Sequence, residues 1–78
     1  MSRELTLYMR EGCHLCEAFI EELNAAQARW QFSYQIIDID ESTQYLTRFH
    51  ARVPVLMYDD QVICEHFLDE NKLAASVL

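Results

Sequence analysis

The order of hydrophobic patterns along this chain predicts an α/β fold in which four strands alternate with three helices. Three observations carry the prediction. Apolar and polar residues alternate near the N-terminus, the apolar period becomes helical after Gly12, and an Asp59-Asp60 turn separates two apolar runs near the C-terminus. A chain of 78 residues has room for one domain, which we expect to span 1–78.

The first half of the chain predicts a strand, a helix and a second strand. Leu5, Leu7 and Met9 alternate with their neighbours, as in a short strand. A helix is expected from about Cys13 or His14 to about Ala28, because apolar residues recur on one helical face: Cys16, Phe19, Ile20, Leu23, Ala26 and Trp30. The stretch FSYQIIDID, residues 32–40, is rich in β-branched and aromatic residues and predicts the second strand.

The second half predicts a short helix, a hairpin and a last helix. Asp40 and Ser42 are candidate N-caps of the short helix. The hairpin joins a strand at 53–58, VPVLMY, to one at 61–64, QVIC. The last helix is expected in HFLDENKLAASVL, where apolar residues recur at roughly helical intervals: Phe67, Leu68, Leu73, Ala74 and Val77. Strands that alternate with helices predict parallel pairing, with the hairpin adding one antiparallel edge.

Composition and charge exclude several classes of partner. The net charge is −7, from 13 acidic against 6 basic residues, and such a surface repels nucleic acids and anionic membranes. The N-terminal MSRELTLYMR lacks an apolar stretch of signal-peptide length, and no segment is long enough to span a membrane. We therefore expect a cytoplasmic protein, monomeric, without nucleic-acid or membrane partners.

The pair Cys13 and Cys16 opens the first predicted helix, in the stretch EGCHLCEAF. The free N–H groups and the dipole of a helix N-terminus favour a thiolate at Cys13, whose pKa should fall below that of a free cysteine. Cys16 lies on the apolar face and should point inward. An exposed attacking sulfur beside a sheltered one suits thiol–disulfide exchange. Gly12 permits the sharp turn that leads into the pair.

The residues around the pair have both chemical and structural interpretations. His14 and Arg10 are near enough in sequence to favour the thiolate, whereas Glu11 and Glu17 oppose it, and His14 is equally well interpreted as a solvated residue. The two cysteines themselves could be small core residues. A structural metal is the other alternative, but zinc usually needs four ligands. Beyond the one close pair there are only distant candidates, so no metal site is expected: Cys64, His14 and His66.

Most of the remaining candidate residues lie near the predicted hairpin, residues 53–64. Cys64 is interpreted as a buried core residue, with a third reactive thiol as the alternative. His50 and Arg52 precede Val53 and could offer positive charge to a substrate carboxylate, or be ordinary loop residues. His66 is expected on the surface, and Trp30 in the core. Val53-Pro54 begins the third strand, where proline is tolerated, at the sheet end that carries the cysteine helix. A cis bond would mark a turn feature, and an ordinary trans proline is the alternative.

The chain resembles, over nearly its whole length, the glutaredoxin branch of the thioredoxin superfamily. GCHLCE, RVPVL and DDQVIC look like a small glutaredoxin-like family. The resemblance implies a thioredoxin-like βαβαββα fold with a mixed four-stranded sheet and a cis proline facing the cysteines. It further implies that Cys13 is the nucleophile and Cys16 the resolving cysteine, and that Val53 and Pro54 dock the substrate. No bound cofactor is implied, and glutathione is the implied reductant.

The chain also departs from the usual glutaredoxin pattern. The inner pair is His14-Leu15 instead of Pro-Tyr, residues 64–67 read CEHF where a Gly-Gly and an acidic residue are usual, and Arg10 is the nearest base before the motif. These departures affect the glutathione groove and leave thiol–disulfide chemistry intact.

The sequence therefore predicts a dithiol oxidoreductase that acts on a disulfide-containing protein or a glutathione mixed disulfide, with His14 and Arg52 as further substrate-binding candidates. Two alternatives remain at this point. One is a non-catalytic thioredoxin-fold module that binds a partner protein or a metal. The other is an iron–sulfur cluster held by Cys13 and its counterpart across a dimer.

Overall fold

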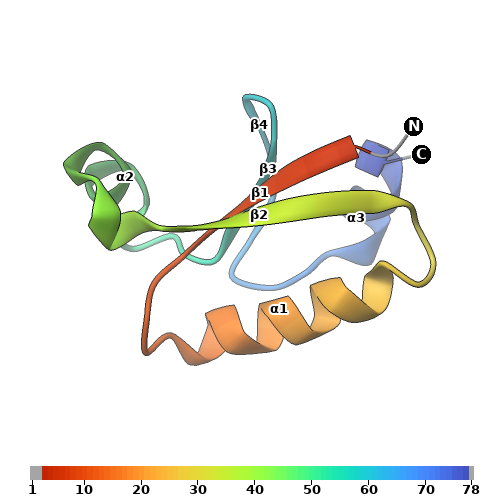
Figure 1. Cartoon of the computed structure of the whole chain (residues 1–78), viewed down its shortest axis with the longest axis horizontal. Coiled ribbons are helices and arrows are strands. Elements are labelled where there is room, and N and C mark those ends of the chain that lie inside the picture. The colour runs from red at the N-terminus through yellow and green to blue at the C-terminus, as the bar shows by residue number, and fades with distance from the viewer. Residues whose placement is uncertain (1–2, 78) are drawn as a thin grey trace.

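Four strands and three α-helices follow one another in the predicted order in a computed structural model, which describes residues 3–77 (Figure 1). The elements are β1 (Arg3–Met9), α1 (His14–Ala26), β2 (Phe32–Asp38), the 3₁₀ helix η1 (Ile39–Glu41), α2 (Thr43–Phe49), β3 (Val55–Tyr58), β4 (Gln61–Glu65) and α3 (Glu70–Val77). The predicted α/β class is confirmed. No helix of the described region has the length and apolar character needed to cross a membrane.

The strands form one mixed sheet in the order β2-β1-β3-β4. Strand β1 pairs parallel with β2 and antiparallel with β3, and β3 pairs antiparallel with β4. Leu7 of β1 lies opposite Ile36 on one side and Leu56 on the other. The two sequence-distant halves of the chain therefore meet at the centre of the sheet.

The direction of β3 corrects the sequence prediction, which had only the last strand antiparallel. The segment between β2 and β3, residues 39–49, packs beyond the end of the sheet where β2 finishes, whereas α1 runs along the sheet (Figure 1). Because this segment does not carry the chain back to the other end, β3 starts where β2 stops and runs against β1. A helix between two strands makes them parallel only when it spans the sheet.

The sheet separates two clusters of buried side chains. One cluster joins α1 and α3 to the sheet and includes Leu5, Leu7, Phe19, Leu23 and Leu73. The other joins α2 to the opposite face: Ile39, Phe49, Val55 and Met57. Successive side chains of a strand point to opposite faces, so Leu56 belongs to the first cluster and its two neighbours to the second. Strand β3, and with it the residues just before it, is thus fixed from both sides.

Several strand boundaries differ from the prediction, and two of them have a clear local reason. The third strand begins at Val55, two residues later than expected, because Pro54 has no N–H for the ladder and the N–H of Val53 donates to the Phe49 carbonyl (3.2 Å). The second strand ends at Asp38, not Asp40. The Asp38 carboxylate accepts from the Asp40 N–H (2.9 Å) and so turns the chain into η1.

The helix ends also differ from the prediction. Helix α3 starts at Glu70, so Phe67 and Leu68 lie outside it, because the Asp69 carboxylate accepts from the N–H groups of Asn71 and Lys72 (3.1 Å each) and caps the helix there. Helix α1 ends at Ala26, two residues early. Ser42 occupies the N-cap position of α2, although its side chain makes no capping hydrogen bond.

Candidate active site

Cys13 and Cys16 lie at the N-terminus of α1, where Cys13 is the N-cap residue. Its backbone is extended (φ −95°, ψ 108°), and its Sγ accepts a hydrogen bond from the Cys16 N–H at 3.0 Å. Cys13 is half-buried, whereas Cys16 has no exposed surface. The two sulfurs form a disulfide, with 5.2 Å between the Cα atoms. The predicted inward orientation of Cys16 is confirmed.

The position of Cys13 stabilises a negative charge on its sulfur after reduction. The first turn of a helix has N–H groups without intrahelical partners, and one of them, that of Cys16, is directed at Sγ. The helix dipole adds to this effect, because its positive end lies at the same place. An N-cap sulfur with an amide donor can therefore serve as a thiolate nucleophile, while the buried Cys16 is sheltered from solvent.

Gly12 sets the direction in which the chain enters the helix. Its φ is +76°, in the left-handed region that side chains with a Cβ rarely adopt. A Cβ at this position would meet no atom within 4 Å. The glycine is therefore required by the backbone conformation and not by crowding.

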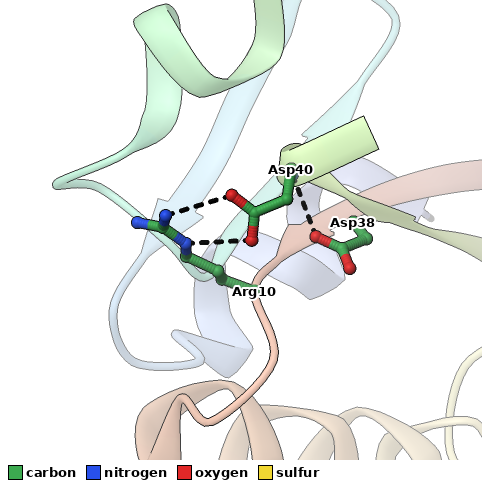
Figure 2. Close-up of polar contacts among 3 residues, drawn as sticks. All are labelled: Arg10, Asp38 and Asp40. Carbon is green, nitrogen blue, oxygen red and sulfur yellow. Dashed lines mark hydrogen bonds and ion pairs between the residues drawn. The ribbon is translucent and has the colours of Figure 1, made fainter. Parts of the chain in front are cut away.

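An ion pair between Arg10 and Asp40 joins the loop before the cysteines to η1 (Figure 2). Nε of Arg10 donates to one carboxylate oxygen of Asp40 and Nη2 lies beside the other, both at 3.0 Å. Figure 2 also shows the Asp38 carboxylate accepting from the Asp40 backbone. The side chains are about two-fifths exposed, so the pair adds at most about 1 kcal/mol of stability. Its chemical consequence is larger, because the guanidinium expected to assist Cys13 is occupied by a carboxylate.

The Val53–Pro54 peptide bond is cis, and Pro54 is fully buried. Val55, the next residue, lies opposite Tyr8 of β1, so this proline loop is at the sheet end from which β1 leads into the cysteine loop. The Pro54 carbonyl accepts from the His66 N–H at 2.8 Å. Among the backbone hydrogen bonds that lie outside the helices and strands of residues 3–77, none ends on the Val53 carbonyl.

Arg52 is engaged with Glu65 and does not present a free charge. Its Nε and Nη2 donate to the two carboxylate oxygens of Glu65 at 3.1 and 2.6 Å, and its guanidinium lies 5.5 Å from the ring centroid of Phe49. These hydrogen bonds lower the pKa of Glu65 and raise the pKa of Arg52. The bridge ties the proline loop to the end of β4. Arg52 was a candidate for contact with a substrate carboxylate, with an ordinary loop residue as the alternative, and in this structure its guanidinium contacts a carboxylate of the protein.

His14, His50 and Trp30 form no hydrogen bond or ion pair with the cysteines among residues 3–77, whereas His66 lines a groove beside α1. The His14 side chain is 98% exposed, and its Nδ1 lies 3.8 Å from the Glu17 carboxylate, so its partner is Glu17 and not Cys13. His50 is exposed. Trp30 is partly buried against the first cluster, as expected of a packing residue.

Cys64 belongs to the first buried cluster, as predicted. It is 7% exposed, and burial raises the pKa of its thiol. A neutral, enclosed thiol is a poor nucleophile. Over residues 3–77, no three His, Cys, Asp or Glu side chains are grouped so that they could hold a metal ion.

A shallow groove of about 180 Å³ lies beside the cysteine helix. It is formed by one face of α1 and the segment that follows β4: Leu15, Ala18, Phe19, Glu22, His66, Phe67 and Leu68. Two of its apolar side chains face solvent, Phe67 (71% exposed) and Leu15 (39%). Sequence reasoning missed this groove because Leu15 and Phe67 meet only through the tertiary fold.

A mixed four-stranded sheet with three helices and a cysteine pair at the start of α1 defines the class of thioredoxin-like proteins. Within that class the chain belongs to the glutaredoxin-like domain family (DUF836), whose family model matches residues 4–78. The predicted resemblance is therefore confirmed.

Individual relatives agree with this family. A glutaredoxin-like protein, the YDR286C homolog of Dictyostelium discoideum, is 35% identical over 92% of this chain and 72% of its own length. The solution structure of protein Ne2328 from Nitrosomonas europaea superposes with a TM-score of 0.90 at 36% identity, covering 100% of this chain and 94% of that one. The X-ray structure of protein XcR50 from X. campestris gives 0.72 at 34% identity, covering 92% of each chain.

Proposed function

We propose that this protein is a thiol–disulfide oxidoreductase in which Cys13 is the nucleophile and Cys16 the resolving cysteine. The observation that carries the proposal is the hydrogen bond from the Cys16 N–H to the Cys13 sulfur, in a pair where one sulfur is accessible and the other is buried. Membership of a glutaredoxin-like family supports it.

The proposed cycle conserves atoms and electrons in two exchanges. The Cys13 thiolate attacks one sulfur of a substrate disulfide, a mixed disulfide forms, and the other substrate sulfur leaves as a thiolate that takes a proton from water. Cys16 then loses its proton and attacks the Cys13 sulfur. The mixed disulfide breaks, the reduced substrate leaves, and two electrons have passed from the cysteine pair to the substrate.

The proline loop supplies the backbone against which the substrate is oriented. In this proposal the Val53 carbonyl accepts a hydrogen bond from a backbone N–H of the substrate, while Pro54 holds the loop in the core. The Val53 N–H already donates to the Phe49 carbonyl, so the Val53 carbonyl is the principal contact with the substrate backbone. Such main-chain hydrogen bonding recognises the substrate backbone and favours an extended peptide.

The oxidised pair returns to the dithiol at the expense of a second thiol. We propose glutathione or another thiol system of the cytoplasm as that reductant: two thiols are oxidised to one disulfide as the Cys13–Cys16 bond is reduced. No bound cofactor takes part in this cycle, because both electrons are carried by the two sulfurs.

The test compares three single variants in reduction of a disulfide-containing peptide. Cys13→Ser should abolish turnover, whereas Cys16→Ser should accumulate a mixed disulfide on Cys13 that intact mass detects as one substrate adduct. Cys64→Ala is the matched control and should keep the wild-type rate, because Cys64 lies in the core. Turnover that survives in Cys13→Ser would contradict the proposal. A wild-type protein without turnover, whose binding of a partner survives Cys13→Ser, would instead favour a binding module.

A further inference from the structure

The groove beside the cysteines has apolar walls that no part of residues 3–77 covers. Leu15, which lies between the two cysteines in the chain, lines it from α1, and Phe67 lines it from the segment after β4. Phe67 is 71% exposed, although a large aromatic side chain gains free energy when it leaves water. Leu15 lies in the first turn of α1, two residues after Cys13, so the groove adjoins the helix end that carries the reactive pair.

Phe67 is held in position and does not hang on a loose loop. Its N–H donates to the Glu65 carbonyl at 2.7 Å, and the preceding N–H, that of His66, donates to Pro54 at 2.8 Å. His66 has φ +67°, which turns the chain sharply at the end of β4. The exposed ring is therefore presented by a segment that is bonded to the proline loop itself.

The charges around the site are unsuited to a ligand that carries two carboxylates. The two arginines adjoining the site in sequence, Arg10 and Arg52, each hold an Asp or Glu carboxylate bidentately. Of the remaining cations, Arg48 on α2 lies over the Phe49 ring, and Lys72 of α3 lines a pocket beside Phe67. A single ammonium beside the groove can bind one carboxylate, whereas glutathione carries two.

Exposed acidic side chains, by contrast, lie on the cysteine side of the fold. Glu22 lines the groove, and Glu11 and Glu17 flank the cysteine pair in the chain. The whole chain carries a formal charge of −7. This field attracts a basic substrate and repels an acidic one.

We infer that the preferred substrate is a protein disulfide whose reactive cysteine is adjacent to an apolar side chain and near a lysine or arginine, in preference to a glutathione mixed disulfide. The apolar side chain packs between Leu15 and Phe67, and the basic side chain approaches Glu22. The inference rests on the proposed function, because the groove matters only if Cys13 performs the exchange. It assigns the choice of substrate to the segment after β4.

The test uses one leaving group on four thiols, so that intrinsic reactivity is matched. The four thiols are glutathione and three short peptides with a single cysteine. The residues next to that cysteine are Leu and Lys in the first peptide, Leu and Glu in the second, and Ser and Lys in the third. Each thiol is converted to its 2-thiopyridyl disulfide. Release of 2-thiopyridone in a single turnover, with the reduced protein in excess, gives the second-order rate constant that corresponds to kcat/KM for each. Hydroxyethyl disulfide, which has neither charge nor side chain, reports whether Cys13 exchanges at all.

The wild-type protein should favour the Leu and Lys peptide over glutathione by about tenfold or more. Phe67→Ser should reduce kcat/KM for that peptide by about five- to thirtyfold and leave the Ser and Lys peptide within about twofold. Ile36→Ser is the matched control, since Ile36 is 48% exposed on β2 and does not line the groove, and it should change neither rate.

Equal or better use of glutathione, or no specific loss in Phe67→Ser, would overturn the inference while the proposed function stands. A protein that fails even with hydroxyethyl disulfide would overturn the proposed function and the inference with it. Because Phe67 is on the surface, its substitution should leave the fold intact, and an unchanged urea midpoint verifies this.

Discussion

The backbone N–H of Cys16 donates a hydrogen bond to the sulfur of Cys13 at 3.0 Å, and this bond links the two cysteines before any substrate arrives. The residue that is fully buried thereby stabilises the residue that is accessible. Because the donor is part of the first helical turn, we expect the same N–H to face the sulfur after reduction, when the thiolate charge develops. The division of roles between the cysteines is thus built into the helix N-terminus.

Cys13 should be the fastest cysteine to be alkylated in the reduced, folded protein. A stabilised, half-exposed thiolate reacts readily, whereas Cys16 and Cys64 are buried. We expect iodoacetamide at neutral pH to modify Cys13 at least about tenfold faster than either of the others, as measured by timed quenching and peptide mass. Equal rates at the three positions would contradict this account of the site.

The bridge between Arg52 and Glu65 should make stability depend on acid pH. Hydrogen bonding to Arg52 lowers the pKa of Glu65 in the folded state, relative to about 4.3 in the unfolded chain. The contribution of the pair is therefore complete above that unfolded value and is lost as the pH falls through the lowered folded pKa. At neutral pH, Glu65→Gln should cost about 0.5–1 kcal/mol in urea unfolding, since both side chains are partly exposed.

The control for this experiment is Asp60→Asn, which removes a negative charge from an exposed turn. The difference in unfolding free energy between the wild type and Glu65→Gln should shrink as the pH is lowered, and that between the wild type and Asp60→Asn should stay small throughout. A Glu65→Gln penalty that is the same at pH 3 and pH 7 would show that the bridge does not supply the stability.

Cys64 should make stability fall at alkaline pH. Burial raises the pKa of its thiol above the unfolded value of about 8.5, so the protonated thiol stabilises the fold below that value. As the pH rises toward the folded pKa, the unfolded chain loses its proton first and stability decreases. With the other two cysteines kept oxidised, Cys64 is the thiol that titrates, and Cys64→Ala should remove this decrease between about pH 8 and 9.5.

The same substitution tests the packing of the core. Cys64→Ala should lower the unfolding free energy by about 1 kcal/mol, the cost of a small cavity in a packed cluster. Activity on a disulfide peptide should remain unchanged under conditions in which the variant is fully folded. A Cys64→Ala protein that is fully stable but inactive would place Cys64 in the chemistry and contradict its assignment to the core.

Releasing Arg10 from Asp40 should make a glutathione disulfide a better substrate for the protein. Asp40→Asn leaves the Arg10 guanidinium without its carboxylate partner and lowers the negative charge near the cysteine loop. We expect kcat/KM for the glutathione 2-thiopyridyl disulfide to rise about threefold, with the Leu and Lys peptide unchanged or slower. Asp60→Asn removes the same charge at a distance, and an equal rise there would mean that net charge, and not Arg10, is responsible.

Structure that depends on neighbouring residues in the sequence was predictable, and contacts between distant segments were not. The burial of Cys16, the helix that starts at the cysteine pair and the order of the elements along the chain followed from periodicity within windows of a few residues. The antiparallel direction of β3 did not, because it depends on where the segment 39–49 packs. That placement results from tertiary contacts of Ile39 and Phe49, which periodicity does not report.

The charges of the site show the same limit. Arg10 and Arg52 were candidates for the site from their positions in the sequence, but their carboxylate partners come from η1 and β4. A sequence shows where a charged residue is but not which residue it will pair with. The two arginines were therefore candidates to act on the substrate or the thiolate, whereas in the structure both are paired within the protein. Phe67 was predicted to lie in the last helix, and its exposure follows from the Asp69 cap, which starts that helix after it.

The most direct test of the central claim is a glutathione redox titration read by alkylation and intact mass. The protein is equilibrated at graded ratios of reduced to oxidised glutathione, trapped with an alkylating agent and weighed. Our account predicts that Cys13 and Cys16 gain or lose their labels together in one reversible two-electron step, while Cys64 remains a thiol throughout. A pair that stays reduced across the whole series, or cysteines that oxidise independently of each other, would contradict it.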